Sequence, residues 1–238
     1  MHPSGDGRAF EPYLKRLTVG TVSFDFFFAT SQARDWYDPI KPYALVEYEW
    51  ALKHIPLQNQ RIVDGGAHHG QYSVLFGLGA RGTSHIASVD AVESNCAITR
   101  VNLAINGLQA DIIRSAISQV DGHIQFSNES NGHILATGGQ TVPSRRLVSV
   151  LPDATIVKLD VEGAEFWIIP DSIDALPAVH SWIVEIHPTA KRQPSAITAL
   201  FQSRGYTLHW VNRARCVVEP YSDDADWSTH STIFARRV

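Results

Sequence analysis

Short apolar runs alternate with helix-like stripes of apolar residues from about residue 61 to the end of the chain. Apolar runs bounded by polar or glycine positions are typical of buried strands, whereas apolar residues spaced by three and four predict amphipathic helices. The pattern predicts strands at 62–63, 86–89, 110–117, 155–160 and 182–186, with helices between them. Strands separated by helices imply an α/β fold with a doubly wound, mostly parallel sheet.

Several of the expected helices have marked ends. The apolar stripe at 97, 101, 104, 105 and 108 stops at Asn106-Gly107, a helix C-terminal signal. The helix after the fourth strand is cut short by Pro170, because proline lacks the N–H that a helix interior needs. A helix at 197–201 ends at Gly205, and alternating residues at 206–210 predict a strand that pairs antiparallel with 232–235. The sheet should therefore carry an antiparallel C-terminal hairpin at one edge.

The first sixty residues follow a different pattern. Alternation over 17–28 places Val22, Phe24, Phe26 and Phe28 on one side of a β-hairpin, whose aromatic face we expect to pack on the main domain. Trp36-Tyr37 marks a loop or the rim of a substrate pocket, or packs in the core. An amphipathic helix follows between Pro42 and Pro56. We divide the chain into a tail, hairpin and helix at 1–60 and a main domain at 61–238.

Composition narrows the class of protein. The 238 residues are 44% hydrophobic and 18% charged, which describes an ordinary globular chain. A net charge of −4 disfavours nucleic acid and anionic membrane as partners, because their binding relies on clustered Lys and Arg. Two distant cysteines indicate neither a disulfide framework nor a zinc site. With no signal peptide or membrane helix in the pattern, we expect a cytoplasmic protein whose residues 1–12 are poorly ordered.

A glycine-rich turn follows the first strand of the main domain. The stretch RIVDGGAHHGQYS at 61–73 runs from strand through Gly65, Gly66 and Gly70 into a helix. Glycines allow positive φ and close approach of a ligand, and the start of the helix offers unpaired N–H groups. The spacing does not fit the G-x-G-x-x-G fingerprint of dinucleotide sites. The turn is therefore either the cradle of a different nucleotide-like ligand or a simple connection between strand and helix.

Asp90 ends the second strand, twenty residues beyond Gly70. Rossmann-like folds keep an acid at this place for the hydroxyl groups of a ribose. The alternative is an acid that stabilises the N-terminus of the following helix. Together with the glycine turn, Asp90 favours a ligand that carries a ribose.

Other polar residues gather where the expected strands end. Lys158, Asp160 and Glu162 alternate, so they point to one side, and Glu185 shares a side with His187. A neutral histidine can take a proton from a hydroxyl, and carboxylates can orient it or hold a divalent cation. The sequence leaves open whether these residues act as a base, as metal ligands or as a structural charge network.

Three passages resemble the FkbM family of S-adenosylmethionine-dependent methyltransferases. VDGGAHHG at 63–70 is similar to the family's D-x-G-A-x-x-G turn, the run from Asp90 to Asn106 to its acid and N-x-x-x-N stretch, and VKLDVEGAE at 157–165 to its K-x-D-x-E-G-x-E signature. Asp90-Ala91 stands where the family usually shows Glu-Pro, and Gly65 replaces a more usual apolar residue. The resemblance covers about 62–188 and implies a Rossmann-like class I methyltransferase fold.

The resemblance also implies an O-methyltransferase acting on a hydroxyl of a sugar or secondary metabolite. Asp90 is expected to hold the ribose, the turn from Gly66 to Gly70 the methionine part, and Ala116 the surroundings of the adenine. His187, Asp160 and Glu185 are the expected catalytic residues, with no metal assigned. The full set expected at S-adenosyl-L-methionine is Asp64, Gly65, Gly66, Ala67, His68, Gly70, Tyr72, Ser73, Asp90, Ala91, Ser115, Ala116 and Asp160.

Two alternatives remain. An NAD(P)-dependent oxidoreductase would share the strand, turn and acid, although the broken fingerprint disfavours it. A domain that binds S-adenosylmethionine without catalysis would share the whole pattern. The expected partner is a small-molecule or glycan hydroxyl substrate, not a nucleic acid or a membrane, and the sequence carries no signal for an oligomeric state.

Overall fold

An eight-stranded sheet forms the centre of the molecule. The computed structural model describes residues 10–237, so the expected disorder of the first nine residues lies outside it. Five neighbouring strands run parallel, and the expected antiparallel pair lies at one edge together with a third strand that the pattern did not predict. The strand order is β13 (Val217–Pro220), β12 (Thr207–Asn212), β14 (Ser231–Arg236), β11 (Ser181–Ile186), β10 (Ile156–Leu159), β3 (Arg61–Gly65), β4 (His85–Asp90) and β5 (Asp111–Arg114).

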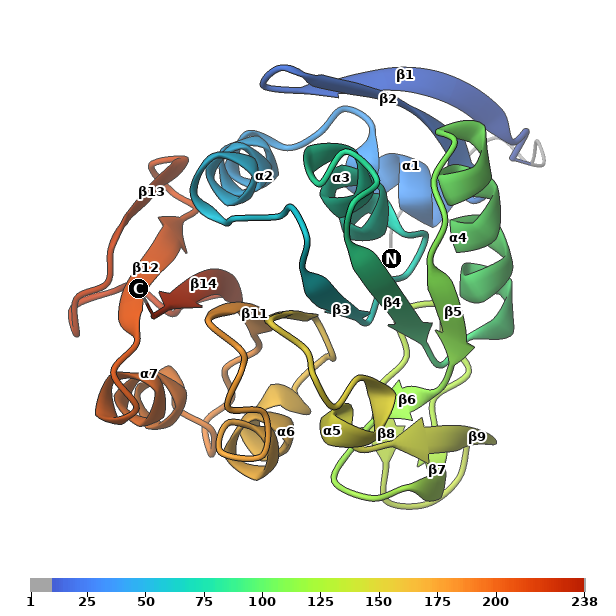
Figure 1. Ribbon diagram of the computed structural model, residues 1–238. Helices are drawn as coiled ribbons and strands as arrows, with labels where there is room; N and C mark the ends of the chain where they lie inside the picture. The colour runs from blue at the N-terminus through green and yellow to red at the C-terminus, as the bar shows by residue number, and fades with distance from the viewer. Residues whose placement is uncertain (1–9, 238) are drawn as a thin grey trace.

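Helices cover both faces of this sheet (Figure 1). One face carries α2 (Pro42–His54), α3 (Gln71–Gly79) and α4 (Glu93–Ile105), and the other carries α5 (Leu147–Val150), α6 (Glu165–Ser172) and α7 (Pro194–Ser203). Successive strand residues point to opposite faces, so Ile62 joins the core beneath α2–α4 while Val63 joins the core beneath α5–α7. None of the helices within residues 10–237 has the length and apolar character needed to cross a bilayer.

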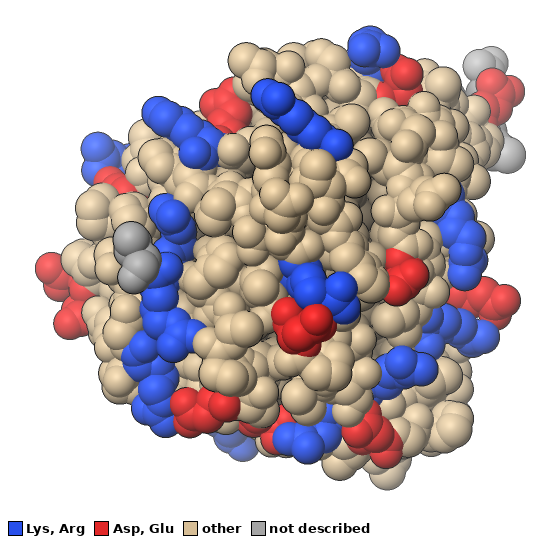
Figure 2. All heavy atoms as spheres, viewed as in Figure 1, with Lys and Arg blue, Asp and Glu red and all other residues tan. Residues whose placement is uncertain are grey.

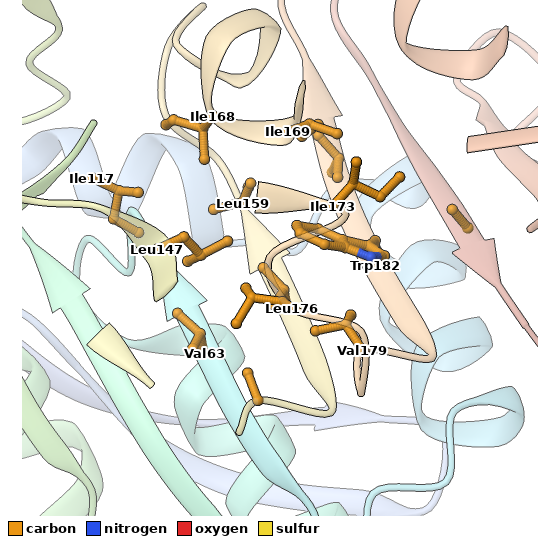
Figure 3. Close-up of a cluster of buried hydrophobic side chains, with 14 of the residues drawn as sticks. Val63, Ile117, Leu147, Leu159, Ile168, Ile169, Ile173, Leu176, Val179 and Trp182 are labelled. Carbon is orange, nitrogen blue, oxygen red and sulfur yellow. The ribbon is translucent and has the colours of Figure 1, made fainter. Parts of the chain in front are cut away.

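Trp182 is the largest fully buried side chain of the core on the α5–α7 side (Figure 3). Its ring is fully buried, and its Nε1–H donates to the Tyr206 hydroxyl over 3.1 Å. That hydroxyl in turn donates to the Val179 carbonyl over 2.6 Å. A buried tryptophan needs a partner for its one polar atom. This chain of hydrogen bonds therefore lets Trp182 anchor β11, the strand that also carries Glu185, in the core.

Helix α6 does not stop at Pro170 as the pattern predicted. It runs on to Ser172, with Pro170 inside it. One proline removes a single backbone hydrogen bond. The Ile173 N–H still bonds to the Ile169 carbonyl over 2.9 Å, and Ile168 and Ile169 are buried in the core. Burial of this face outweighs the lost bond, so the expected early end of the helix was wrong.

The N-terminal hairpin is confirmed and forms an outer layer beyond α3 and α4 (Figure 1). It consists of β1 (Tyr13–Val19) and β2 (Val22–Phe28), and Phe24, Phe26 and Phe28 are buried in the core beneath it. Trp36 and Tyr37 belong to the helix α1 (Ser31–Tyr37), so the expected loop was wrong. Both residues line the cavity described below, which places them at a rim.

The apolar stripe predicted for α4 does not face the core as expected. Val101 and Ile105 are exposed, whereas Asn95, Thr99 and Asn102 are buried. Asn102 accepts the Phe27 N–H over 2.6 Å and donates to the His69 carbonyl over 2.9 Å. The inner face of α4 is polar because it satisfies backbone groups of the hairpin and of the glycine turn, which sequence periodicity does not show.

Replacing Asn102 by alanine should lower the free energy of unfolding by about 2–6 kcal/mol. The change leaves one buried and one partly buried backbone group without a partner, at about 1–3 kcal/mol each. Urea denaturation of the full chain measures the effect, and Arg100→Ala on the exposed face of the same helix should stay within about 0.5 kcal/mol. Equal effects of the two substitutions would show that Asn102 does not hold the hairpin to the turn.

The expected third strand is split in two. Residues 111–114 form β5 in the main sheet, and the chain bends at Ser115, whose N–H bonds to the Asp90 carbonyl over 2.9 Å. Residues 122–139 contain a pair of antiparallel strands that belong to a second sheet beside the first. That sheet has the order β6 (Ala116–Ile117), β9 (Gln140–Arg145), β7 (Gly122–Phe126) and β8 (Ile134–Leu135).

Candidate active site

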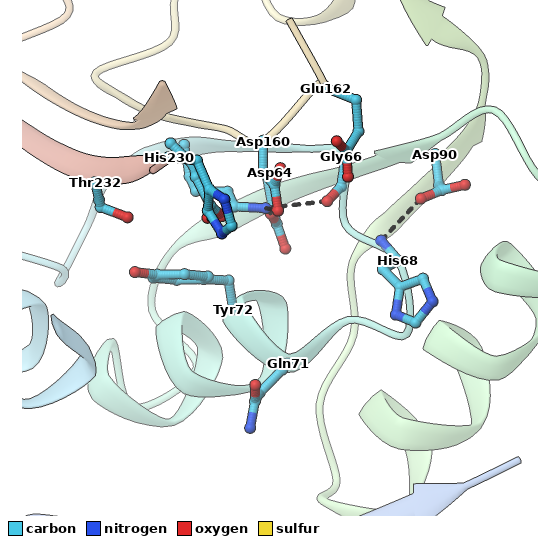
Figure 4. Close-up of polar contacts among 12 residues, drawn as sticks. Asp64, Gly66, His68, Gln71, Tyr72, Asp90, Asp160, Glu162, His230 and Thr232 are labelled. Carbon is cyan, nitrogen blue, oxygen red and sulfur yellow. Dashed lines mark hydrogen bonds and ion pairs between the residues drawn. The ribbon is translucent and has the colours of Figure 1, made fainter. Parts of the chain in front are cut away.

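One cavity of about 470 Å³ lies beyond the carboxyl ends of β3, β4, β10 and β11. This is the edge where open α/β sheets bind ligands. Figure 4 shows Asp90 and His68 at one end, Asp160 and Gly66 in the middle, and His230 and Thr232 at the other end. Of the residues expected at the site, those that line the cavity are Gly66, Ala67, His68, Tyr72, Asp90, Ala91, Ser115, Ala116, Asp160, Glu185 and His187.

Gly66 brings the turn against the end of β10. Its φ is +69°, and a Cβ at this position would lie 1.7 Å from the Asp160 carbonyl oxygen. The Gly66 carbonyl accepts a hydrogen bond of 3.0 Å from Lys158 Nζ, marked by a dashed line in Figure 4. Only glycine fits here, because any side chain would push Asp160 and the turn apart.

Four of the expected cofactor residues do not line the cavity: Asp64, Gly65, Gly70 and Ser73. Asp64 is fully buried, accepts a hydrogen bond from Ser73 Oγ over 2.6 Å and lies 3.4 Å from Lys158 Nζ. A Cβ on Gly70 would meet Thr99 at 2.6 Å, so that glycine lets α4 approach. We propose that these residues support the cavity floor from below.

Lys158 joins the floor to the middle of the cavity. Its ammonium lies 4.0 Å from Asp160 as well as 3.4 Å from Asp64. Burial alone would lower the pKa of Lys158, but the charges of Asp64, Asp160 and Glu185 outweigh it and raise that pKa. The lysine is therefore a fixed positive charge that holds the turn and compensates two carboxylates.

Asp90 is held at one end of the cavity by backbone donors. It accepts hydrogen bonds from the N–H groups of His68 and Val92, both over 2.8 Å, and from Asn95 Nδ2 over 3.1 Å. Burial raises the pKa of Asp90 to about 6, although these hydrogen bonds oppose the rise. The carboxylate is thus pre-oriented and poorly hydrated, which suits it to accept hydrogen bonds from ligand hydroxyls.

The His68 ring closes this end of the cavity. Its Nδ1 lies 2.9 Å from the Tyr37 hydroxyl and its Nε2 lies 3.0 Å from Ser130 Oγ. The ring stacks on His69 at 3.9 Å. Burial, then the neighbouring His69 and Lys158, lower the pKa of His68 well below 6.5, so the ring is neutral. His68 therefore ties α1 to the segment between β7 and β8 across the cavity.

Several acids surround His187 in the cavity. The His187 Nε2 atom lies 3.5 Å from Glu162 and 3.9 Å from Asp160. Burial alone would lower the pKa of His187, but Glu165, Asp160 and Glu185 outweigh it and raise that pKa from 6.5 to about 9. Burial and the charges of Asp160 and Glu47 raise the pKa of Glu185 well above its usual range.

Three of these groups are also close enough to hold a cation. Donor atoms of Asp160, Glu185 and His187 lie within 4.8 Å of one another. Two carboxylates and one imidazole are ligands for a divalent first-row metal ion. The geometry thus brings together the three residues expected to be catalytic and supports either proton transfer or metal binding.

The sequence did not predict two further charged residues that line the cavity, Glu47 and Arg213. Glu47 of α2 accepts hydrogen bonds from the Tyr72 hydroxyl and, over 2.9 Å, from Thr232 Oγ1. Burial raises the pKa of Glu47. Arg213 lies 3.6 Å from Glu185 and stacks over the Tyr43 ring at 3.7 Å. A charged residue on an amphipathic helix is normally solvated, so Glu47 gave no signal until the fold placed α2 beside β14.

Comparison with known proteins identifies the family. The model of the methyltransferase FkbM domain matches residues 64–208. The chain is similar in structure to the methyltransferase FkbM from Methylobacillus flagellatus, with a TM-score of 0.53 and 12% identity, over 82% of this chain and 48% of that one. The chain thus spans about half the length of that protein. The search of curated proteins found no match to the present chain.

Two further solved structures share the fold. A T. thermophilus 16S rRNA methyltransferase in complex with AdoMet and guanosine gives a TM-score of 0.55 at 10% identity, over 95% of this chain and 51% of that one. A SAM-dependent methyltransferase from Agrobacterium tumefaciens gives 0.53 at 13% identity, over 97% and 71%. The expected class I methyltransferase fold is confirmed, and the family match speaks against the oxidoreductase alternative. The chain belongs to the FkbM family of S-adenosylmethionine-dependent methyltransferases.

Proposed function

We propose that the protein transfers a methyl group to a hydroxyl of a sugar or secondary metabolite. The observation that carries the proposal is the layout of a single cavity. A pre-oriented carboxylate, Asp90, lies at one end, and a histidine surrounded by acids, His187, lies beyond the glycine turn. The first suits a ribose, and the second suits removal of a proton from a hydroxyl.

The residues present fit S-adenosylmethionine. Asp90 would accept hydrogen bonds from the ribose hydroxyls, and Ser115 and Ala116 would border the adenine. The turn at Gly66, closed against Asp160, leaves room for the methionine part. When bound, this cofactor supplies a methyl group on a positively charged sulfur, which an oxygen nucleophile can attack. The partly buried acids in the middle of the cavity favour a cationic ligand there.

His187 supplies the base. Its Nε2 would accept the proton of the acceptor hydroxyl, and Asp160 and Glu162 would stabilise the imidazolium that forms. A pKa of about 9 means that the ring carries a proton at neutral pH in the free protein. Since a base must start without its proton, the rate should rise with pH towards about 9.

The acceptor would enter at the end lined by α2 and β14. Glu47, Thr232 and Arg213 border that end, and their donors and acceptors suit a polyhydroxylated molecule. Most of the face in Figure 2 is uncharged, and apart from one narrow run of Lys and Arg down its left side, basic and acidic side chains lie near one another rather than forming a broad basic surface for a phosphate backbone. These features support a small-molecule acceptor over a nucleic acid.

Transfer of a labelled methyl group tests this function. The protein is incubated with methyl-labelled S-adenosylmethionine and either a hydroxyl-rich metabolite pool or total RNA. We expect label in small molecules as methyl ethers. Label in RNA would replace the proposed acceptor class, and cofactor binding without transfer to either pool would favour the non-catalytic alternative.

Asp90→Ala should weaken binding of S-adenosylhomocysteine by about 1.5–3 kcal/mol, the cost of losing hydrogen bonds to a charged group. Wild-type affinity should also fall as pH drops through about 6, because a protonated Asp90 no longer accepts as strongly. Isothermal titration measures both effects, and Asp111→Ala at the exposed sheet edge is the matched control. Unchanged affinity in Asp90→Ala would remove this residue from the ribose site.

A further inference from the structure

Glu165 is a fully buried carboxylate behind the active site. It opens α6 and does not line the cavity. Among residues 10–237, no Lys or Arg forms an ion pair with Glu165 at 4.0 Å or less. A buried ionised group without a cation is costly unless hydrogen bonds or another charge compensate it. The partners of Glu165 therefore indicate its role.

Both carboxylate oxygens of Glu165 reach across to the segments that carry the catalytic candidates. Oε1 accepts the backbone N–H of His187 over 2.6 Å, and Oε2 accepts the backbone N–H of Gly163 over 2.9 Å. Oε1 also lies 3.5 Å from the His187 ring atom Nδ1. Glu165 thus holds the end of β11 to the loop after β10, and it faces one particular ring nitrogen.

The other ring nitrogen of His187 faces the cavity. Nε2 lies near Glu162 and Asp160, and the ring stacks on His230 at 5.3 Å. Glu185 lines the cavity beside them. Carboxylates thus lie on both sides of the imidazole. When the ring loses one proton, the remaining hydrogen stays on the nitrogen whose carboxylate attracts it more strongly.

Burial decides between the two sides. Glu162 and Glu165 each lie 3.5 Å from a ring nitrogen, but the Glu162 side chain is 35% exposed and that of Glu165 is 0% exposed. Water screens the first interaction and not the second, since electrostatic attraction is stronger at low local dielectric. Both oxygens of Glu165 already accept backbone N–H groups, so the carboxylate also faces the ring as an acceptor, and its attraction at 3.5 Å favours the hydrogen on Nδ1.

We propose that Glu165 is the positioning residue of the active site, which keeps the hydrogen of neutral His187 on Nδ1 and leaves the Nε2 lone pair facing the cavity. This inference rests on the proposed role of His187 as the base. It gives Glu165 a role toward the His187 ring in addition to the two backbone hydrogen bonds that it accepts. Glu165 itself touches neither cofactor nor acceptor.

The tautomer of His187 can be read directly by ¹⁵N NMR of histidine side chains. Spectra of the ¹⁵N-labelled full chain are recorded in chelator at a pH where the ring is neutral, and His187→Gln identifies the signals. We expect wild type to show hydrogen on Nδ1 and a free lone pair on Nε2. Hydrogen on Nε2 in the wild-type protein would overturn the proposal without any variant of Glu165.

Two variants remove one carboxylate each from opposite sides of the ring. In Glu165→Gln the amide can donate as well as accept, so we expect the Nδ1–H preference to be lost and both tautomers to appear. In Glu162→Gln, the matched control at the same 3.5 Å from the other nitrogen, the preference should persist. A wild-type tautomer ratio in a folded Glu165→Gln would contradict the positioning role.

The readout separates this inference from the proposed function. NMR of the free protein needs no acceptor, and binding of S-adenosylhomocysteine checks that each variant keeps its fold. If the tautomer responds as expected but no methyl group is transferred to any hydroxyl, the function fails and the positioning role stands. If methyl transfer occurs but the tautomer of His187 is the same in wild type and Glu165→Gln, the proposed function stands and the positioning role fails.

Discussion

Replacing His187 with alanine should reduce turnover by roughly 10²–10⁴-fold, the usual contribution of a general base. Binding of S-adenosylhomocysteine should persist, because Asp90 is held by His68, Val92 and Asn95 and not by His187. Initial rates of labelled methyl transfer measure the loss, and titration with S-adenosylhomocysteine checks the site. His85 lies at the start of β4, at the end of that strand away from Asp90 and the cavity. His85→Ala should therefore leave the rate within about twofold, since surface substitutions away from a site have small effects.

Chelation separates the base from a metal centre at the same three residues. Asp160, Glu185 and His187 could bind a cation that lowers the pKa of a bound hydroxyl. Under the base mechanism, wild type keeps its rate in EDTA, and its rate rises with pH towards about 9. Loss of activity in EDTA with recovery on adding a divalent metal would contradict that mechanism, and so would a fully active His187→Ala.

Gly66→Ala should weaken binding of S-adenosylhomocysteine by roughly 100-fold or more, about 2.8 kcal/mol. The new Cβ would lie 1.7 Å from the Asp160 carbonyl oxygen, so either the turn or the end of β10 must move. Both segments border the cavity, and a shift of either spoils the cradle. Isothermal titration measures the affinity, and circular dichroism checks that the sheet is retained.

Gly82 provides the matched control for this substitution. Its φ of +71° is close to the +69° of Gly66, but a Cβ there would meet nothing within 4 Å. Gly82→Ala therefore introduces the same backbone strain without the clash, and cofactor affinity should stay at the wild-type value. If both variants bound S-adenosylhomocysteine like wild type, the close approach of Gly66 to Asp160 would not matter for the site.

The parallel sheet was predictable because buried parallel strands are nearly continuous apolar runs. The turn at Gly66 and the acid at Asp90 were predictable for a related reason, since both follow directly from the ends of such strands. The polar inner face of α4 was not, because Asn102 is buried to satisfy the backbone of Phe27, 75 residues away in the chain. Periodicity shows where apolar side chains repeat and carries no information on such distant partners.

Part of the site was not predictable either, because it also depends on residues that are distant in the chain. Asp64 was expected beside the cofactor because it precedes the glycines, yet it is fully buried with Ser73 and Lys158 below the cavity. Glu47 and Arg213 come from segments outside the matched motifs, and they line the same cavity as His187 because α2 and β12 pack beside the antiparallel strand β14. The proposed acceptor end therefore depends on tertiary packing, whereas the turn and the acid at the proposed cofactor end follow from local sequence.

A crystal structure of the full chain with S-adenosylhomocysteine would test the central claim most directly. We predict the ribose hydroxyls on Asp90, the adenine beside Ser115 and Ala116, and the sulfur turned towards Asp160 and His187. A ligand bound outside this cavity, or one whose sulfur points away from His187 with the ribose far from Asp90, would contradict the account.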